Sequence, residues 1–349
     1  MSLPAEQSVY RVTKFAGYSA IKKTLEPLSV KLGNNEVLVK VMAVSLNYRD
    51  VDIANGTYPL PAKKGVIPGS DGSGNIVKIG SSVTDLQVGD RVITNFNPEH
   101  ISGPVKDHNT AFGAIRDGVL SQYIVVPSYG VNKIPSDSHL THEEASALVC
   151  TGATAWNALY GSGRPFIAGQ SVLMLGTGGV SITALILAKA AGAVTIITSS
   201  SDEKLKYVKE KYGADYTINY KTYPDWEKKV LEFTHGEGVD FVIENGGNGT
   251  IAKSIESIKN GGQICIIGYL SQYQTIPDVV MGLLVKGATA RGINIASKQL
   301  GEELIRFVHA KKLPMPVEKV FGFSEEEVHA AYTNVQNQNQ IGKTVIKLY

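Results

Sequence analysis

The sequence is short of the residues that disulfide frameworks and thiolate metal sites require. Among its 349 residues there are only two cysteines, Cys150 and Cys265. Two cysteines exclude a multi-disulfide framework and any zinc site built from four thiolates. So few cysteines are typical of a protein that works in a reducing compartment.

Long apolar runs and a surplus of one charge are also missing. No stretch approaches the ~18 uninterrupted apolar residues that a membrane span needs. The formal net charge is +2, which is too small to indicate a nucleic acid or an acidic membrane as partner. The opening residues, MSLPAEQSVYRV, contain neither the apolar core of a signal peptide nor an arginine-rich transit sequence. We therefore expect a cytoplasmic protein that acts on a small molecule.

The middle of the chain contains a regular alternation of strand-like and helix-like segments. Apolar strand patterns occupy 171–175, 194–198, 216–220, 239–243, 263–268 and 288–293. Helical spacing occupies 178–192, 202–213, 224–234, 250–258 and 277–285. Strands that alternate with helices in this way predict an α/β fold with a doubly wound, six-stranded parallel sheet.

The flanking segments have a different pattern. The first ~130 residues are rich in short alternating runs separated by glycine and proline, which is typical of an all-β domain. The end of the chain predicts helices over 301–312 and 324–334 and a last strand over 343–349. We expect this tail to return to the β domain, with a cleft between the domains. The predicted domains are 1–132, 133–298 and a returning segment, 299–349.

A glycine-rich turn, LGTGGVSITA, follows the first strand of the α/β region. Gly176, Gly178 and Ser181 occupy the three positions of the G-x-G-x-x-G pattern, and Gly179 and Val180 begin the helix. The first glycine allows the tight turn, and the second lets the backbone approach a pyrophosphate. Because the N-terminus of a helix presents free N–H groups to an anion, the turn predicts a dinucleotide site.

The second strand of this region ends in TSSSDEK rather than in the carboxylate of a typical NAD site. The hydroxyls of Ser199 and Ser200 accommodate a 2′-phosphate, and Lys204 supplies positive charge. Tyr220, which closes the third strand, can add a hydrogen bond. In the alternative interpretation the serines and Asp202 only cap the helix and Lys204 is a solvated surface charge. The sequence thus favours NADP(H), with NAD(H) as the alternative cofactor.

Three stretches, in order and with suitable gaps, resemble the medium-chain dehydrogenase/reductase superfamily. They are PGSDGSGNIVKIGSSVTDLQVGDRV, ALVCTGATAWNAL and LGTGGVS. The resemblance covers nearly the whole chain. It implies a GroES-like β domain, a Rossmann domain and a homodimer.

The chain departs from this family at the catalytic zinc site. Zinc-containing members have a cysteine where this chain has Asn47 and a histidine where it has Ser70. Only Cys150 finds a counterpart, and one thiolate cannot hold zinc, which needs three protein ligands. The resemblance therefore implies a zinc-independent member, of the quinone oxidoreductase-like or zinc-less alcohol dehydrogenase-like branch. Asp71, next to Ser70, is expected to orient neighbouring backbone or a basic residue.

Two side chains are candidates for the catalytic donors of a site without zinc. Asn47 lies in LNYRD, which resembles the asparagine-containing segment of quinone oxidoreductase-like members. Tyr58, in NGTYP, matches the tyrosine after glycine in the quinone- and enoyl-reductase branches. The alternatives are a turn-capping role for Asn47 and simple packing on Pro59 for Tyr58.

Further cofactor contacts are implied by the resemblance. Thr154 lies where the family touches the nicotinamide. The others follow the fourth and fifth strands of the α/β region, at the strand ends where doubly wound sheets bind ligands. They are Asn245, Gly246, Gly268 and Tyr269.

The sequence leaves three functions open. Hydrogen-bond donors stabilise the negative charge that develops on the acceptor oxygen less strongly than a metal does. A quinone or an α,β-unsaturated carbonyl, which delocalises that charge, is therefore the favoured acceptor. A zinc-free alcohol dehydrogenase or carbonyl reductase is the first alternative. The other is an NADP-binding protein with a structural or regulatory role and little turnover.

Overall fold

The middle of the chain forms one six-stranded sheet in the computed structural model, which describes residues 3–28, 30–271 and 277–349. Its strand order is β10-β9-β8-β11-β12-β13, and every neighbouring pair is parallel. The strands are β8 (Ser171–Met174), β9 (Val194–Ser199), β10 (Tyr216–Asn219), β11 (Val239–Glu244), β12 (Ile258–Ile266) and β13 (Thr289–Gly292). The predicted doubly wound sheet is confirmed.

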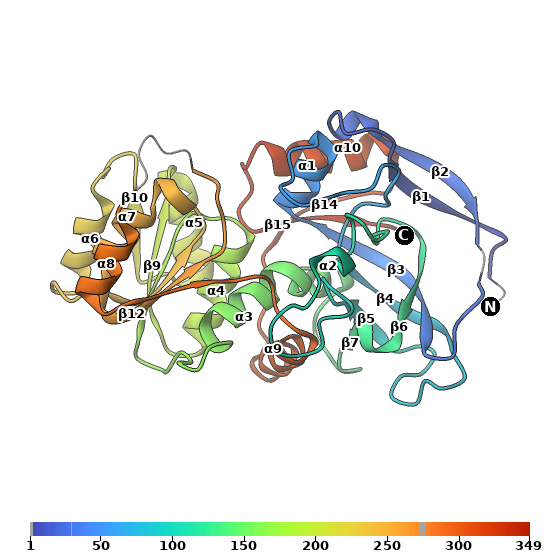
Figure 1. The fold of residues 1–349 in the computed structure, drawn as a ribbon, viewed down its shortest axis with the longest axis horizontal. Coiled ribbons are helices and arrows are strands. Elements are labelled where there is room, and N and C mark those ends of the chain that lie inside the picture. Colours follow the sequence, from blue (N-terminus) through green and yellow to red (C-terminus); the bar gives the residue numbers. More distant parts are fainter. Residues whose placement is uncertain (1–2, 29, 272–276) are drawn as a thin grey trace. The chain divides into compact units, whose positions relative to one another are not determined.

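Helices cover this sheet and bury its central strands (Figure 1). Helices α4 and α5 pack together against β8, β9 and β10, and α6, α7 and α8 lie side by side along β10, β11 and β12. Val172, Leu173 and Met174 on β8 are fully buried, as expected of a strand covered on both faces. The helices are α3 (Ala153–Tyr160), α4 (Gly179–Ala190), α5 (Asp202–Tyr212), α6 (Trp226–Phe233), α7 (Ile251–Ser257) and α8 (Val279–Lys286).

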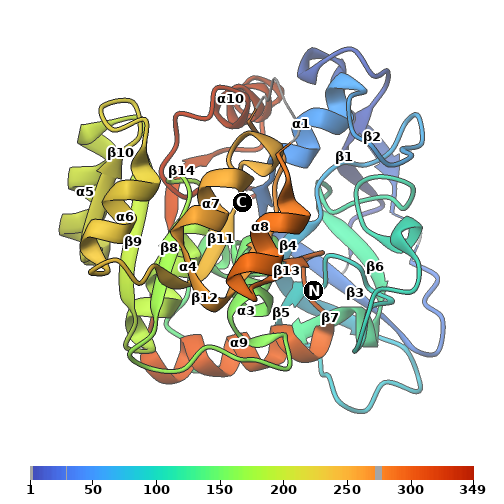
Figure 2. The same ribbon diagram turned by 60° about the vertical axis from the view of Figure 1, so that its left-hand side comes forward.

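The N-terminal part of the chain and its tail share a second, largely antiparallel sheet (Figure 2). Its order is β14-β15-β3-β4-β5-β7, with β6 paired to β3, and β1 and β2 form a separate hairpin. The strands are β1 (Glu6–Val12), β2 (Ile21–Pro27), β3 (Glu36–Leu46), β4 (Asp71–Ile79), β5 (Arg91–Thr94), β6 (Tyr123–Pro127), β7 (Val131–Lys133), β14 (Val317–Phe321) and β15 (Lys343–Lys347). Because β15 pairs with β3, the tail returns to the β domain as expected.

The β-rich part of the chain contains helices that the sequence did not predict, in addition to those of the tail. The predicted tail helices are present as α9 and α10, but the helix directly after β3 was missed. It ends at Gly56, whose φ of +76° suits glycine. The helices are α1 (Tyr48–Asn55), α2 (His142–Ser146), α9 (Lys298–Lys311) and α10 (Glu325–Gln336).

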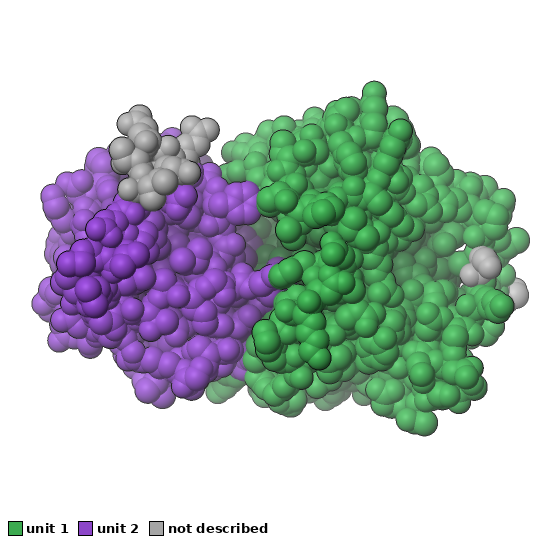
Figure 3. Space-filling view, viewed as in Figure 1, with its two compact units in different colours: residues 1–153, 296–349 green, residues 154–295 purple. Residues whose placement is uncertain are grey.

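The chain divides into two compact units, which Figure 3 shows in different colours. Unit 1 consists of residues 1–153 and 296–349, and unit 2 of residues 154–295. Each has its own apolar core: the unit 1 core includes the fully buried Tyr10 and Tyr332, and that of unit 2 includes Ile196 and Val242. Among the described residues, no helix has the length and apolar character needed to cross a membrane.

Candidate functional site

Asn47 stands where the first long strand of unit 1 turns into a helix. It directly follows β3 and is the N-cap residue of α1, so strand and helix both fix its backbone. Its N–H donates to the carboxylate of Asp50 at 2.9 Å, as one half of a capping box. The side chain of Asn47 is buried, with 8 % of its surface exposed. Asn47 thus has the predicted capping role at α1. Its side-chain amide also makes a contact elsewhere in unit 1.

The sheet register brings two charged residues to Asn47. Strand β15 runs antiparallel to β3 with Thr344 opposite Leu46, so Lys343 comes next to Asn47 although 296 residues separate them. Strand β4 pairs Asp71 with Ser45, two residues before Asn47. The Lys343 ammonium donates to Asn47 Oδ1 at 2.6 Å and to the backbone oxygen of Leu46, and it lies 4.0 Å from Asp71 Oδ2. The sequence did not predict this contact between Lys343 and Asn47.

Asp71 performs both tasks expected of it. Its Oδ2 accepts a hydrogen bond from the backbone N–H of Cys150 at 3.2 Å, and its charge faces Lys343, the basic residue. Its Oδ1 accepts a hydrogen bond from Ser70 at 2.6 Å. Complete burial raises the pKa of Asp71, and Lys343, Ser70 and Asn47 oppose this effect only in part.

The residues around Asp71 do not fit a catalytic zinc ion. The three family ligand positions carry an amide, a hydroxyl and a thiol, and burial raises the pKa of the Cys150 thiol to about 12. Zinc binds a thiolate and needs two further protein ligands. Within the part of the chain that the structure describes, no group of three histidine, cysteine or acidic side chains is placed to hold a metal. The ammonium of Lys343 lies beside both Asp71 and Asn47.

Tyr58 lies against a buried arginine. The guanidinium carbon of Arg49 is 5.2 Å from the centre of the Tyr58 ring and 4.7 Å from that of Phe96. Arg49 also donates to the backbone oxygen of Phe112 at 3.0 Å, so the cation holds the loop around Phe96 and Phe112 close to α1. Tyr58 itself is half-buried. Its ring therefore packs on a cation, an arrangement that the sequence did not predict.

Asp50 is a buried acid with a pKa near neutrality. Burial raises its pKa to about 6, and Asp71 adds to this rise, while Arg49, the N–H of Asn47 and Lys343 oppose it. Arg49 lies 3.6 Å away, and the buried hydroxyl of Tyr332 on α10 also faces this charge. The folded protein therefore binds the Asp50 proton more tightly than the unfolded chain does.

This proton linkage predicts a pH-dependent stability. As the pH rises from about 4 to about 6, ionisation of Asp50 lowers the free energy of unfolding by up to about 3 kcal/mol. His142, whose pKa burial lowers to about 4, acts in the opposite direction, so the test is a comparison with Asp50→Asn. Urea unfolding of both proteins from pH 4 to pH 7 should show the wild type losing stability relative to the variant. Parallel curves would contradict the assignment.

The glycine turn of unit 2 has the geometry of a phosphate cradle. Gly176 has a φ of +79°, and its N–H donates to Thr198 at 3.2 Å. A Cβ added at Gly178, the N-cap residue of α4, would meet no atom within 4 Å. Open space in front of a helix N-terminus is what a pyrophosphate requires, so these residues fit a dinucleotide. Gly179 and Val180 form the first turn of α4.

Ser181, at the third position of the motif, ties the turn to the next strand of the sheet. Its hydroxyl donates to the backbone oxygen of Leu175 at 2.7 Å and accepts a hydrogen bond from the Asn245 amide at 2.9 Å. Asn245 follows β11, and in the strand order β8 lies between β9 and β11. The structure thus brings Asn245 to the glycine turn, at the switch point where doubly wound sheets bind ligands.

The predicted 2′-phosphate residues lie at the ends of β9 and β10. Ser199 is the last residue of β9, and its backbone oxygen accepts a hydrogen bond from the N–H of Tyr220 at 3.0 Å. Ser200 and Lys204 are half-buried and Tyr220 is exposed. The carboxylate of Asp202 accepts a hydrogen bond from Asn219 at 2.9 Å. Asp202 therefore links α5 to β10.

The remaining predicted cofactor residues also lie in unit 2. The N–H groups of Gly246 and Gly268 bond to Glu244, at the end of β11, and Tyr269 is exposed. Thr154 on α3 is 1 % exposed, and its hydroxyl has no hydrogen-bond partner among the described residues. A buried hydroxyl without a partner is costly, and a bound ligand can supply one.

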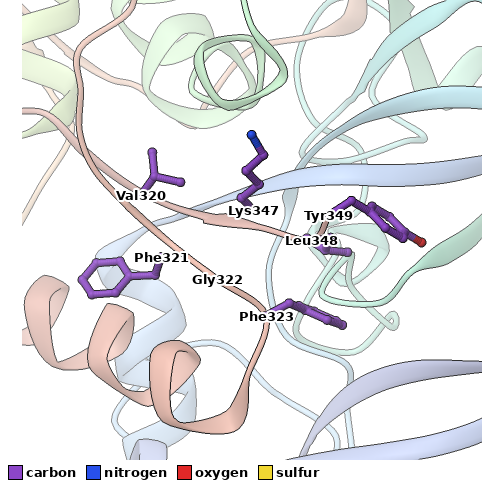
Figure 4. Close-up of a pocket in the computed structure, with 7 residues that line it drawn as sticks. All are labelled: Val320, Phe321, Gly322, Phe323, Lys347, Leu348 and Tyr349. Carbon is purple, nitrogen blue, oxygen red and sulfur yellow. The ribbon is translucent and has the colours of Figure 1, made fainter.

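A shallow hollow lies at the other end of β15, away from Lys343. It measures about 300 Å³ and is lined by Val320, Phe321, Gly322, Phe323, Lys347, Leu348 and Tyr349 (Figure 4). None of the predicted site residues is among them. Lys347 on its rim forms an ion pair with Glu143 at 3.0 Å.

Comparison with known families and proteins shows which family the chain belongs to. Residues 33–136 match the family described as alcohol dehydrogenase GroES-like domain, and residues 179–310 match the zinc-binding dehydrogenase family. A zinc-type alcohol dehydrogenase-like protein of Schizosaccharomyces pombe is 40 % identical over 341 residues, which cover 96 % of this chain and 97 % of that protein.

Solved structures show the same relationship. A putative alcohol dehydrogenase from Sinorhizobium meliloti 1021 is 32 % identical with a TM-score of 0.90, covering 99 % of this chain and 100 % of that one. A crotonyl-CoA carboxylase/reductase is 26 % identical with a TM-score of 0.84, covering 99 % and 89 % of the two chains. Dehydrogenases of this kind use a nicotinamide cofactor. With its GroES-like and Rossmann parts, the chain belongs to the medium-chain dehydrogenase/reductase superfamily of oxidoreductases.

Proposed function

We propose that the protein is a zinc-independent, NADPH-dependent reductase of conjugated carbonyl compounds, namely quinones or α,β-unsaturated ketones and aldehydes, and that it works as a cytoplasmic homodimer. The observation that carries this proposal is the buried group of Asn47, Lys343 and Asp71 in unit 1. It includes Asn47, one of the positions at which the family resemblance implies a zinc ligand in zinc-containing members. The donor that it offers to an acceptor is the neutral amide of Asn47, because the Lys343 ammonium is bonded to Asn47 and to the backbone oxygen of Leu46.

The residues of each unit have separate tasks in this reaction. When bound, the nicotinamide supplies the hydride. In unit 2 the glycine turn would hold the pyrophosphate, and the Thr154 hydroxyl would form a hydrogen bond with the nicotinamide end of the cofactor. In unit 1 the amide N–H of Asn47 donates to the acceptor oxygen, where negative charge develops. Tyr58 steadies the resulting anion, and the proton arrives from its hydroxyl or from water.

A conjugated acceptor suits this donor set better than an isolated ketone. Hydride addition to a ketone concentrates the charge on one oxygen, whereas an enolate or quinol anion spreads it over several atoms. Neutral donors are therefore sufficient for the conjugated compound. The similarity to a crotonyl-CoA carboxylase/reductase supports this choice, because the crotonyl group is itself α,β-unsaturated.

A substrate panel tests the proposal. The purified protein is assayed with NADPH against enones, quinones, simple aldehydes and ketones, and with NADP against secondary alcohols. We expect kcat/KM for the best enone or quinone to exceed that for the best simple carbonyl by at least about tenfold, or about 1.4 kcal/mol in transition-state stabilisation. A preference for simple carbonyls or alcohols would contradict it.

A zinc-free carbonyl reductase or alcohol dehydrogenase is the second candidate. The Lys343 ammonium favours it. Because this cation is hydrogen-bonded to the Asn47 amide, the amide can better stabilise a negative charge that is concentrated on one oxygen. The names of the relatives favour it as well. The panel separates the two candidates. NADPH binding without turnover of any compound would instead support a structural or regulatory role.

Lys204 gives a prediction about the cofactor. If it meets a 2′-phosphate, Lys204→Gln should raise the Kd for NADPH about tenfold, equivalent to ~1.4 kcal/mol, and leave the Kd for NADH within about twofold. Fluorescence titration measures both constants. Lys206→Gln is the matched control, since Lys206 lies on the same helix and is exposed. Equal losses for the two cofactors would refute the NADP(H) assignment and favour NAD(H).

The surface of unit 2 supports the homodimer. Strand β13 ends the six-stranded sheet, and the neighbouring helix α8 exposes an apolar stripe of Val280, Met281, Leu284 and Val285 at 79, 52, 70 and 74 %. A second copy placed edge to edge would pair the free side of β13 and cover the stripe.

Leu284→Glu tests this arrangement. Light scattering should give twice the mass of one chain for the wild type and the mass of one chain for the variant, because a carboxylate in the covered stripe is costly. Leu25→Glu, which changes an exposed leucine on β2, should remain dimeric. A monomeric wild type, or a variant that stays dimeric, would exclude this interface.

A further inference from the structure

We propose that Lys343 is a positioning residue for Asn47: its ammonium holds the amide oxygen of Asn47 and thereby directs the N–H donors of the amide to the acceptor. This inference rests on the proposed function, since it assumes that Asn47 donates to the acceptor oxygen. It adds a residue from the far end of the chain that acts through Asn47.

The position of Lys343 is fixed on several sides. The pairing of β15 with β3 sets its backbone opposite Asn47. Its side chain is only 3 % exposed, and the ammonium is bonded to the Leu46 oxygen and to Asn47 Oδ1. Asp71, at 4.0 Å, supplies the opposing charge. A buried ammonium needs partners for its donors and a balancing charge, and here two of its three donors are bonded and Asp71 supplies the charge.

The chemistry of the two groups determines which way the amide faces. An ammonium has donors and no acceptor, so the group it meets must be the amide oxygen. With its oxygen held by Lys343, the Asn47 amide keeps its NH₂ end for other partners. The Nδ2 atom is buried, and the Asp71 carboxylate attracts one of its N–H groups, without a hydrogen bond of ordinary geometry among the described residues. The amide has two N–H groups and Asp71 attracts one of them, so the other remains for an incoming carbonyl oxygen.

The bond to Lys343 also strengthens Asn47 as a donor. A cation at the amide oxygen draws electron density from the N–H bonds, and such polarisation is effective in a buried, low-dielectric site. An acceptor oxygen that gains negative charge would benefit more than the neutral ground state. The effect of Lys343 should therefore fall on kcat and leave cofactor binding unchanged.

A double-mutant cycle tests the inference. Lys343→Met, Asn47→Ala and the double variant are assayed on the best acceptor of the panel, with kcat, acceptor KM and the Kd for NADPH measured for each. We expect Lys343→Met to lower kcat about tenfold or more in the wild-type background and less than about twofold in the Asn47→Ala background. The Kd for NADPH should stay within about twofold of the wild-type value. Lys347→Met, on the same strand, should leave kcat unchanged.

The outcomes separate the inference from the proposed function. If Asn47→Ala retains full turnover, the proposed role of Asn47 is wrong, and the role of Lys343 is overturned with it. If Asn47→Ala loses turnover while Lys343→Met has no effect, or has the same effect in both backgrounds, only the inference about Lys343 is overturned. Should Lys343→Met not fold, Lys343→Met/Asp71→Asn replaces it, with Asp71→Asn as its reference, because this pair removes both buried charges.

Discussion

Replacing Asn47 by alanine should lower kcat on the best conjugated acceptor by roughly 10²–10³-fold, the usual loss when one donor to a developing oxyanion is removed. Steady-state kinetics with saturating NADPH measures this loss. The reason is specific to the amide: it is buried, and Asp71 and Lys343 leave one of its N–H groups for the acceptor oxygen. Binding of NADPH, which depends on unit 2, should be unaffected.

The same substitution also removes the N-cap side chain of α1 and one partner of the Lys343 ammonium. We expect it to lower the free energy of unfolding by about 1–3 kcal/mol, so activity is compared well below the melting temperature of the variant. Asn75→Ala, at a half-buried asparagine on β4, is the matched control and should keep full turnover.

Asn47→Asp separates donation from packing. The carboxylate retains an oxygen for Lys343 and for the capping of α1, but it has no N–H to donate. This variant should therefore be as slow as Asn47→Ala, and thermal unfolding checks that it folds, because the new carboxylate lies near the buried Asp71 and Asp50. Turnover close to that of the wild type in either variant would show that Asn47 is not the donor.

Replacing Gly178 by valine should weaken dinucleotide binding by at least about 100-fold, or about 2.7 kcal/mol. At this position the backbone has φ −78° and ψ 179°, an extended conformation that valine adopts readily. Since an added Cβ meets no protein atom within 4 Å, the side chain fits the folded protein. It occupies the space that a pyrophosphate needs at the start of α4.

Titration of NADPH fluorescence checks this loss, and thermal unfolding checks that the fold is intact. Gly163→Val is the control, because Gly163 also has open space around it and lies in an exposed loop. An unchanged Kd for Gly178→Val would mean that the glycine turn does not hold the dinucleotide.

The sequence predicted the α/β unit well because its signals are local. Continuous apolar strands such as β8, and helices closed by glycine such as α5, are determined by neighbouring residues, and their boundaries agree with the structure within a few residues. The phosphate turn is equally local. Family resemblance singled out Asn47 and Asp71, and Asp71 does contact backbone, at the N–H of Cys150, and lies 4.0 Å from a basic residue, Lys343.

The features that the sequence did not predict depend on distant pairings. Lys343 meets Asn47 only because β15 inserts between β14 and β3 in one particular register, and no local pattern specifies that register. The helix α1 did have local signals, namely Asn47 as N-cap, Asp50 three residues later and Gly56 at its end. They are weak signals because the helix has only eight residues, too few for an apolar repeat to distinguish it from a turn.

One measurement tests the central claim most directly. The purified protein is dialysed against a strong chelator, its metal content is determined by mass spectrometry, and its NADPH-dependent turnover of the best enone or quinone is compared before and after dialysis. The account predicts full turnover with far less than one metal ion per chain. Turnover that disappears on dialysis and returns with one equivalent of zinc would contradict it.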